Sequence, residues 1–346
     1  MIPTVGYAAP AAGAPLAKFQ FERRDPGDRD VRIDILFCGI CHSDVHSSRG
    51  EWGEGHFPLV PGHEIVGRVE RTGARATRFK PGDLVGVGCY VNSCRTCASC
   101  REGQEGYCEA GPLFTYNSQD KTGGFTQGGY SSTIVVDEDF VLRIPDGLSP
   151  ERAAPLLCAG ITTYSPLKRW KVGRGHRLGV VGLGGLGHMA VKFGSSFGAQ
   201  VTVFSTSPGK ETEARRLGAR DFVLVKDAAR MSALSKRFDF ILDTVSAAHN
   251  MDGLLELLRR DGALILVGAP PDPIPVSAFS LILGRRSLAG SLIGGIPEIQ
   301  EMLDACGKTG VQSDVEVIAP SQVNAAFDRV VRGDVRYRFV LDMKKI

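Results

Sequence analysis

The sequence predicts an α/β protein that combines a doubly wound parallel sheet with a separate β-rich part. Between residues 175 and 267, short apolar strands alternate with glycine turns and amphipathic stretches, a rhythm typical of a parallel sheet covered by helices. Residues 1–153 instead contain short β-branched runs separated by glycine and proline, and the runs at 315–318 and 337–341 share this character. We therefore expect one domain at residues 1–153 and 296–346, and the other at residues 154–295.

The β-rich part is expected to be antiparallel and barrel-like. Its clearest strand signals are residues 31–36, 65–69 and 83–87. Turn signals at Pro81-Gly82-Asp83 and Gly128-Gly129 separate such runs.

The parallel sheet is expected to begin with a strand at residues 178–181. This strand leads into a glycine motif and a helical stretch to Phe197, and a second helical stretch ends at Leu217 before Gly218. The remaining expected strands are residues 201–204, 222–225, 238–242 and 263–267.

Composition narrows the class of protein. Of the 346 residues 43% are apolar and the formal net charge is +3, which describes a globular protein without a basic patch for nucleic acid. The N-terminal segment lacks the pattern of a secretory signal, and no run of about 18 apolar residues predicts a membrane span. We expect a cytoplasmic protein with no nucleic-acid or membrane partner, whose cysteines stay reduced.

Four cysteines form a compact cluster with metal-binding spacing. Cys94, Cys97, Cys100 and Cys108 are separated by two, two and seven residues, which lets four thiolates converge on one tetrahedral zinc ion. A disulfide framework is the competing interpretation, but it suits short secreted chains with even cysteine counts, and this chain has nine cysteines. The segment 90–129 has little apolar periodicity, so we expect a structural zinc ion to order it.

A second, dispersed set of metal ligands comprises Cys41, His63, Glu64 and Cys158. Two thiolates and one imidazole are a recognised set for a catalytic zinc ion, because three protein ligands leave one position open. Taken singly, each residue has an ordinary explanation: a histidine satisfied within the structure, a small buried cysteine, a surface carboxylate. Their combination favours the metal.

The glycine motif predicts a dinucleotide site. In Gly182-Leu183-Gly184-Gly185-Leu186-Gly187 the first glycine allows a tight turn, the second a close approach of backbone to pyrophosphate, and the last close helix packing. An ordinary strand-to-helix turn is the alternative. No acid follows the second strand to bind a ribose hydroxyl. The residues found there are Ser205, Thr206, Ser207 and Lys210, which suit a 2′-phosphate, so we predict a preference for NADPH over NADH. The alternative is that they form a solvated polar turn.

Three further motifs surround the predicted catalytic ligands: Cys38-Gly-Ile-Cys41-His42-Ser43-Asp44, Gly62-His63-Glu64-x2-Gly67-x5-Gly73-x2-Ala76 and Cys158-Ala159-Gly160-Ile161-Thr162-Thr163-Tyr164. With these motifs the chain resembles the zinc-containing medium-chain alcohol dehydrogenases, and within them the cinnamyl alcohol dehydrogenase-like, NADP-dependent aldehyde reductases. The resemblance covers nearly the whole chain. It implies a Rossmann coenzyme domain and a GroES-like catalytic domain with a structural zinc lobe, hence two zinc ions per subunit.

The resemblance also assigns roles around the catalytic zinc. Cys41, His63 and Cys158 hold the ion, and Glu64 can transiently exchange with its fourth ligand. Ser43 hydrogen-bonds the substrate oxygen and His46 relays the proton to solvent, although a plain surface histidine is a rival interpretation. Asp44 orients the ligand His63, with a simple turn residue as the alternative interpretation. His42 stands where other members of the family place an arginine against the pyrophosphate of the cofactor.

Further resemblances concern the cofactor, the substrate and the oligomer. Strips that meet the cofactor in the family correspond to Thr162, Val267, Gly268, Ala269, Ser291 and Ile293. An apolar pocket for an aromatic or aliphatic aldehyde corresponds to Trp52, Phe57, Tyr90, Phe114 and Ile293, each of which could equally serve packing. The run 287–293 resembles the edge strand through which family members form homodimers, with a strand covered by its own helix as the alternative.

The function implied is zinc-dependent, reversible hydride transfer between NADP(H) and aldehydes or primary alcohols, chiefly NADPH-dependent aldehyde reduction. The alternatives are an NAD-linked polyol dehydrogenase and a non-catalytic nucleotide-binding protein that keeps the fold. A zinc-independent quinone reductase would lack the ligands present here. Cys38, Cys89 and Cys306 receive no role.

Overall fold

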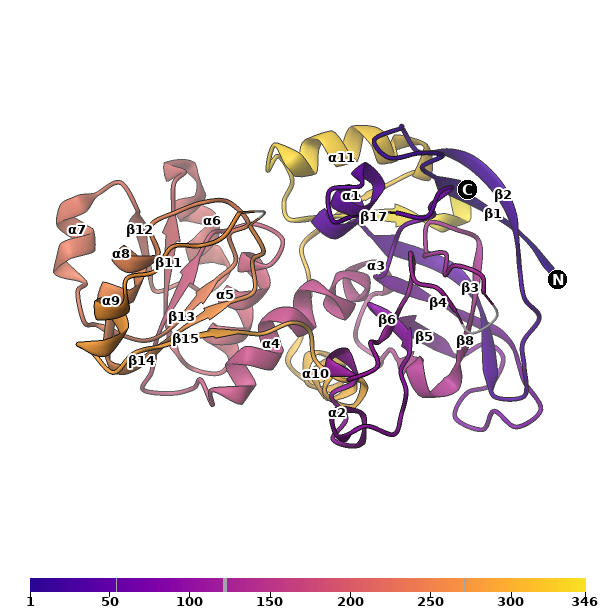
Figure 1. The fold of residues 1–346 in the computed structure, drawn as a ribbon, viewed down its shortest axis with the longest axis horizontal. Helices are drawn as coiled ribbons and strands as arrows, with labels where there is room; N and C mark the ends of the chain where they lie inside the picture. Colours follow the sequence, from indigo (N-terminus) through magenta and orange to yellow (C-terminus); the bar gives the residue numbers. More distant parts are fainter. Residues whose placement is uncertain (54, 121–122, 271) are drawn as a thin grey trace. The chain divides into compact units, whose positions relative to one another are not determined.

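The computed structural model describes residues 1–53, 55–120, 123–270 and 272–346 and divides into two compact units (Figure 1). Unit 1 comprises Met1–Ile161 and Gly294–Ile346, and unit 2 comprises Thr162–Ile293. The sequence placed the boundaries after residues 153 and 295. The first division falls later in the structure because helix α4 (Ala159–Arg169) runs across it.

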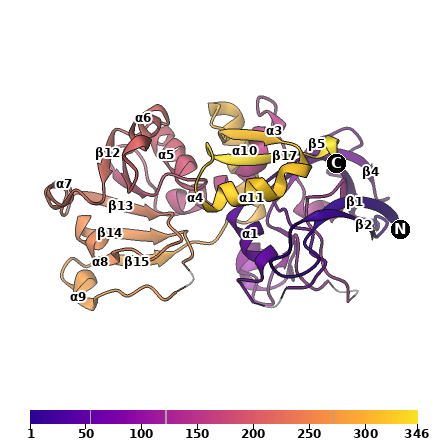
Figure 2. The ribbon, with the colours of Figure 1, turned by 90° about the horizontal axis from the view of Figure 1, so that it is seen from above.

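Unit 2 is built on a parallel sheet of six strands in the order β12-β11-β10-β13-β14-β15. The order reverses between β10 and β13, so the carboxyl ends of these two strands flank the place where such sheets bind ligands. Figure 2 shows β13, β14 and β15 lying side by side. The strands are β10 (Arg177–Val181), β11 (Gln200–Ser205), β12 (Asp221–Leu224), β13 (Phe238–Asp243), β14 (Leu258–Leu266) and β15 (Ser287–Gly290).

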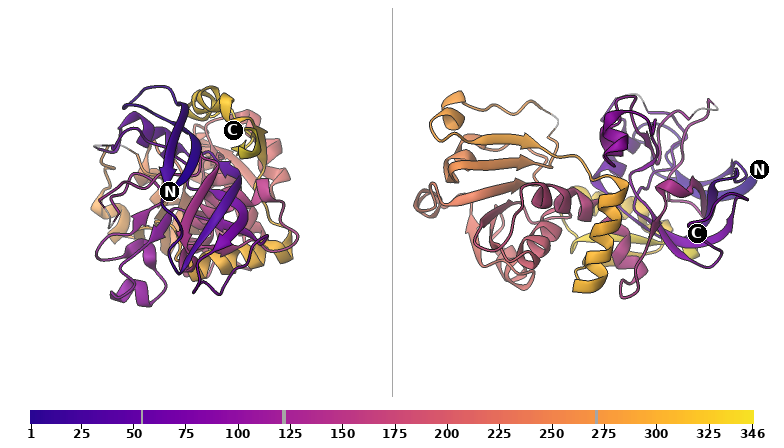
Figure 3. Two further views of the ribbon diagram at one scale, coloured as in Figure 1. Left: turned by 90° about the vertical axis from the view of Figure 1, so that its right-hand side faces the viewer. Right: turned by 90° about the horizontal axis from the view of Figure 1, so that it is seen from below.

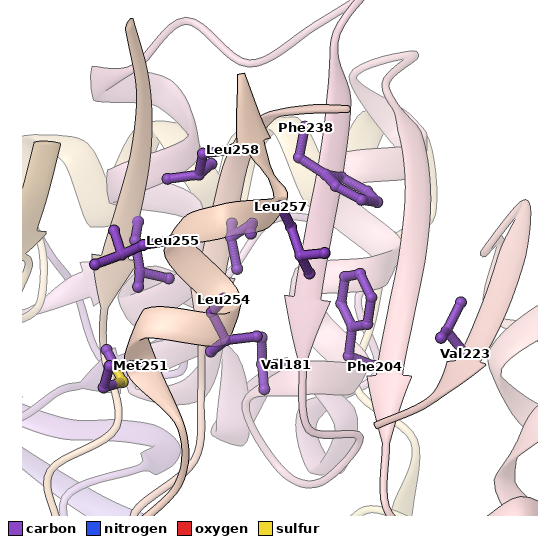
Figure 4. Close-up of a cluster of buried hydrophobic side chains, with 11 residues drawn as sticks. Val181, Phe204, Val223, Phe238, Met251, Leu254, Leu255, Leu257 and Leu258 are labelled. Atoms are coloured by element: carbon purple, nitrogen blue, oxygen red, sulfur yellow. The ribbon is translucent and has the colours of Figure 1, made fainter. Parts of the chain in front are cut away.

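Helices cover both faces of this sheet. A Cβ on Gly194 of α5 would touch Leu178 and Val201, so α5 packs closely on one face. The opposite face carries Val181 and Phe204, which belong to a core cluster with the apolar side of α8 (Figure 4). The helices of unit 2 after α4 are α5 (Gly187–Ser196), α6 (Glu211–Arg216), α7 (Ala228–Ala233), α8 (Met251–Leu257) and α9 (Ala278–Ile282), with the 3-10 turn η4 (Pro208–Lys210).

Unit 1 contains a seven-stranded sheet in which β3 is central. It pairs antiparallel with β4, β8 and β17, so the C-terminal strand joins the β-rich part, as the sequence predicted (Figure 3). The sheet comprises β3 (Asp30–Gly39), β4 (Ile65–Thr72), β5 (Leu84–Val87), β8 (Thr133–Asp137), β9 (Leu142–Arg143), β16 (Val315–Ile318) and β17 (Arg338–Asp342). Two smaller sheets pair β1 (Ile2–Ala8) with β2 (Ala17–Arg23) and β6 (Tyr90–Asn92) with β7 (Leu113–Phe114).

The sequence analysis gave the C-terminal segment a β-rich character and missed its helical content. Helix α11 buries Val323, Ala326 and Phe327, which recur at helical spacing between the two strands that were recognised. The helices of unit 1 are α1 (His42–Arg49), α2 (Ala98–Arg101), α3 (Pro150–Ala153), α10 (Ile296–Thr309) and α11 (Val323–Val331), and its 3-10 turns are η1 (Glu105–Tyr107), η2 (Glu138–Phe140), η3 (Ala154–Leu157), η5 (Pro320–Gln322) and η6 (Met343–Lys345). Within the described ranges, no helix combines the length and apolar character needed to cross a membrane.

Candidate active site

Unit 1 brings together the dispersed ligand set predicted from the sequence. One ligand atom from each of Cys41, His63, Glu64 and Cys158 lies within 4.8 Å of all the others. The Cys158 Sγ atom lies 3.9 Å from Cys41 Sγ and 3.3 Å from His63 Nε2. Thiolates that share a tetrahedral zinc ion at about 2.3 Å lie about 3.8 Å apart, so the spacing and the donor chemistry both fit zinc.

Local structure explains how these side chains converge. Cys41 is the N-cap of α1 directly after β3, and His63 and Glu64 lead into β4, which pairs with β3. Cys158 lies between η3 and α4. A hydrogen bond from Cys158, with the positive charge of Arg338, holds the pKa of Cys41 well below its usual value, so this thiol is prepared to act as a thiolate ligand.

Asp44 is a fully buried carboxylate that orients this site. Its Oδ1 accepts a hydrogen bond from Gly62 N at 3.1 Å and lies 3.2 Å from His63 Nδ1. Its Oδ2 accepts hydrogen bonds from Cys41 N at 2.8 Å and from the Tyr130 hydroxyl at 2.9 Å. With its Nδ1 proton bonded to Asp44, His63 keeps the Nε2 lone pair free on the side of Cys158.

The sequence analysis missed Arg338, which forms a buried ion pair with Glu64. Burial raises the pKa of Glu64 to about 7, and Arg338 acts against this rise. A Cβ on Gly39 would collide with the Glu64 carboxylate, so only glycine leaves room for it. The signal in the sequence was a lone arginine inside the apolar C-terminal strand, because buried arginine requires a partner.

The four-cysteine cluster forms a second metal site in unit 1. One Sγ atom each from Cys94, Cys97, Cys100 and Cys108 lies within 4.8 Å of the others. Backbone N–H groups of Thr96 and Cys97 point at the Cys94 Sγ at 3.5 and 3.3 Å and lower its pKa to about 6. Four sulfur donors with no open position fit a closed structural zinc site.

The predicted dinucleotide site lies in unit 2, at the carboxyl ends of its strands. Gly182 adopts φ +87° directly after β10, and a Cβ on Gly187 would collide with the Gly182 carbonyl. Among the described residues, no atom beyond those of its chain neighbours lies within 4 Å of a Cβ built on Gly184, so the backbone there is open to approach. Strand β11 ends at Ser205, whose Oγ accepts a hydrogen bond from Ser207 N at 3.1 Å, and the Lys210 ammonium donates to the Leu183 carbonyl at 2.9 Å.

Comparison with known proteins decides the family. The alcohol dehydrogenase GroES-like domain matches residues 27–146, and the zinc-binding dehydrogenase domain matches residues 185–308. NADP-dependent alcohol dehydrogenase C of Mycobacterium bovis is 53% identical over 346 residues, the full length of both chains. The chain belongs to the zinc-binding alcohol dehydrogenases.

Other relatives of this zinc-binding dehydrogenase agree with that assignment. Aldehyde reductase YahK of Escherichia coli is 51% identical over 339 residues, 97% of each chain. A cinnamyl alcohol dehydrogenase from Sorghum bicolor superposes with a TM-score of 0.96 at 49% identity, covering 99% of this chain and 98% of that chain. The fold class and the family predicted from the sequence are confirmed, and the protein is an oxidoreductase.

The residues expected to move protons lie on α1 of this dehydrogenase. Ser43 Oγ is 3.5 Å from Cys41 Sγ, beside the metal ligands. His46 Nδ1 contacts the Glu51 carboxylate, and its ring stacks on Trp52 with centroids 4.9 Å apart. The ring of His42 follows at 5.2 Å from His46, so this histidine pair forms a polar path along one side of the helix.

The residues expected to line a substrate pocket are less uniform in their placement. Tyr90 is buried, donates its hydroxyl proton to the Gly294 carbonyl and packs edge-on against Phe140, which is a structural role. Trp52 and Phe114 are exposed and Phe57 is half-buried in unit 1, whereas Ile293 is buried and belongs to unit 2.

Cys89 adjoins the metal ligands. Its thiol lies 3.9 Å from the Leu157 carbonyl, and hydrogen bonds with Cys41 and then with Cys89 raise the pKa of Cys158. It directly precedes β6, whose first residue, Tyr90, is buried. The segment before β6 therefore lies next to the residues that carry Cys158.

Proposed function

We propose that this dehydrogenase transfers hydride reversibly between NADP(H) and aldehydes or primary alcohols in a zinc-dependent reaction, and that it chiefly reduces aldehydes with NADPH. The observation that carries the proposal is the convergence of two thiols, one imidazole and one carboxylate on a single site. The names of its relatives, an NADP-dependent alcohol dehydrogenase and an aldehyde reductase, support the same reaction.

In this proposal, zinc is held by Cys41, His63 and Cys158, where it supplies the Lewis acidity that polarises a carbonyl group while NADPH supplies the hydride. Asp44 fixes the ring of His63 through Nδ1. The Glu64 carboxylate, balanced by Arg338, stays within reach of the same site and can take part in exchange of the fourth ligand.

Ser43 and His46 carry the proton. The Ser43 hydroxyl lies beside Cys41 and donates its proton to the oxygen of the reduced substrate. His46 is partly exposed and its Nδ1 contacts the Glu51 carboxylate, which places an imidazole between the site and solvent where it can relay a proton.

The preference for NADPH is proposed from the end of β11. No carboxylate stands there to bind a 2′-hydroxyl, while the hydroxyls of Ser205, Thr206 and Ser207 and the ammonium of Lys210 suit a 2′-phosphate. The strips 267–269 and 291–293, with Thr162 and His42, are proposed to complete the cofactor contacts. We propose Trp52, Phe57, Phe114 and Cys89 for the substrate side, with an aromatic or medium aliphatic aldehyde as substrate.

We further propose a cytoplasmic homodimer joined through unit 2. Strand β15 is an edge of the parallel sheet, and an open edge can pair with its copy. Beside it, α9 and the next residue expose Phe279, Ile282 and Leu283 by 68, 66 and 82%. Large apolar side chains gathered in this way are typical of an interface between subunits.

The test follows oxidation of NADPH and of NADH by the purified protein with benzaldehyde, cinnamaldehyde, butanal, xylose and a quinone, before and after treatment with a chelator. Metal-dependent, NADPH-selective reduction of the aldehydes is expected. Preference for NADH and xylose would favour the polyol dehydrogenase instead. Activity that survives loss of the metal, or activity with the quinone alone, would refute the proposal.

A further inference from the structure

A buried carboxylate stands at the carboxyl end of β13 with no part in the proposed chemistry. Asp243 is 1% exposed, and β13 is the neighbour of β10, where the strand order of the sheet reverses. Its Oδ1 accepts a hydrogen bond from Val245 N at 3.1 Å, and its Oδ2 lies 2.8 Å from His249 Nε2. The pair therefore closes the ends of the short loop 244–250.

The ring of His249 lies between two acceptors. Its Nδ1 is 2.7 Å from the Ala247 carbonyl oxygen, which can only accept, so Nδ1 carries a proton. The bond to Asp243 then needs one further proton, either on Nε2 or on the carboxyl group. When this proton lies on Nε2, the bond joins an imidazolium to a carboxylate and is charge-assisted. Such bonds are stronger than bonds between neutral groups.

The loop closed by this bond touches the glycine turn. The Thr244 hydroxyl donates to the Val181 carbonyl at 2.8 Å, directly before the turn. A Cβ on Gly182 would lie 3.0 Å from both Thr244 Oγ1 and Val245 Cγ2. A shift of the loop would therefore press on the turn that is expected to meet the pyrophosphate.

The same loop touches the second cofactor strip, which follows β14. A Cβ on Gly268 would collide with the backbone of Val245, so the two segments lie in backbone contact. The Ser246 hydroxyl accepts a hydrogen bond from Ala269 N at 3.2 Å. The loop 244–250 is thus a common neighbour of two of the segments proposed to bind the dinucleotide, the Gly182 turn and the strip 267–269.

We infer that His249 is a positioning residue for the dinucleotide: its bond to Asp243 holds the loop 244–250 in the conformation that keeps the Gly182 turn and the 267–269 strip ready for NADP(H). The inference rests on the proposed function for the identity of the ligand. Without the bond, the loop occupies several conformations, and the apparent Kd rises as the inverse of the binding-competent fraction that remains. Hydride transfer in the assembled complex is unchanged.

The test measures the Kd of NADPH by fluorescence, together with KM and kcat, on the full-length zinc enzyme. His249→Ala is expected to raise the Kd and the KM for NADPH about tenfold and to leave kcat within about twofold. His249→Gln keeps an N–H that can reach Asp243, so it is expected to recover most of the loss. The matched control is His176→Ala, because His176 lies in the same unit but just before β10, at the opposite end of the sheet, where it accepts a bond from Gly173 N.

Each outcome separates the inference from the proposed function. Wild-type protein that binds no NADPH would refute the proposed function. Wild-type protein that binds NADPH with the same Kd as His249→Ala would overturn the inference alone. Equal losses in His249→Ala and His176→Ala, or a fall in kcat without a change in Kd, would also overturn it, since a positioning role acts on binding.

Discussion

Replacing Asp44 by asparagine keeps the size of the side chain but puts an NH2 group where an oxygen now accepts two hydrogen bonds. If the NH2 group of the asparagine faces Gly62 N and His63 Nδ1, the histidine must carry its proton on Nε2 instead of Nδ1. The Nε2 lone pair that would bind the metal is then lost. If the NH2 group faces Cys41 N and Tyr130 instead, the tyrosine hydroxyl can turn and accept a hydrogen bond from it, but the buried Cys41 N–H has no acceptor. Both orientations damage the site.

The magnitude follows from the second, less costly orientation. An unsatisfied buried donor costs about 1–3 kcal/mol, and each bond that changes from a charged to a neutral acceptor loses about 1 kcal/mol. The zinc-free protein should therefore lose about 4 kcal/mol of unfolding free energy. The affinity for the catalytic zinc should fall about 10- to 100-fold, as is typical when the partner of a ligand histidine is removed.

Urea unfolding of the zinc-free protein and the rate of zinc release to a chelator measure these two effects. Asp34→Asn is the control, because Asp34 is exposed on β3 and its nearest cation, Arg32, is 3.9 Å away. The control should behave as the wild type in both assays. An Asp44→Asn protein with wild-type stability and wild-type zinc release would show that the buried carboxylate does not hold His63, and the reasoning would fail.

Three further predictions concern the cofactor, the structural metal and the dimer. Lys210→Ala should lower kcat/KM for NADPH about tenfold and change the value for NADH less than about twofold, because one charge-assisted bond to the 2′-phosphate is lost; equal losses with both cofactors would contradict this role. Cys97→Ala should remove one of two zinc ions and lower Tm, measured by metal analysis and thermal unfolding, and a protein that keeps both ions would refute the structural site. Leu283→Asp should halve the mass measured by light scattering, while Val331→Asp, on an exposed apolar residue of unit 1, should not; a wild type that is already monomeric would exclude the dimer.

Local spacing made much of this protein predictable. The Cys94 cluster and the turn at Gly182 are set by residues a few positions apart, so their chemistry is visible in a short stretch of sequence. The alternation of strands and helices likewise predicted the parallel sheet that the structure contains. Resemblance to a family then linked Cys41, His63 and Cys158, which no local pattern connects.

What the sequence analysis missed depends on contacts between distant segments. The partner of Glu64 is Arg338, 274 positions away, and only the pairing of β17 with β3 brings them together. Cys89 likewise meets Cys158 only because the chain before β6 folds against the residues at the end of η3. Helix α11 lies between two strands that were recognised in the sequence, and the whole segment was therefore predicted to be β-rich. The helical spacing of its apolar residues was nevertheless visible.

The pairing of β17 with β3 has a consequence for biosynthesis. Unit 2 is one continuous stretch, so all its strands and helices have been synthesised before residue 294 is added. Unit 1 can complete its sheet, and Glu64 can gain its counter-ion, only after Arg338 has been translated. Because domains fold as units during synthesis, the nucleotide-binding half can fold first, and Glu64 gains its counter-ion last, although the zinc ligands Cys41, His63 and Cys158 have all been translated much earlier.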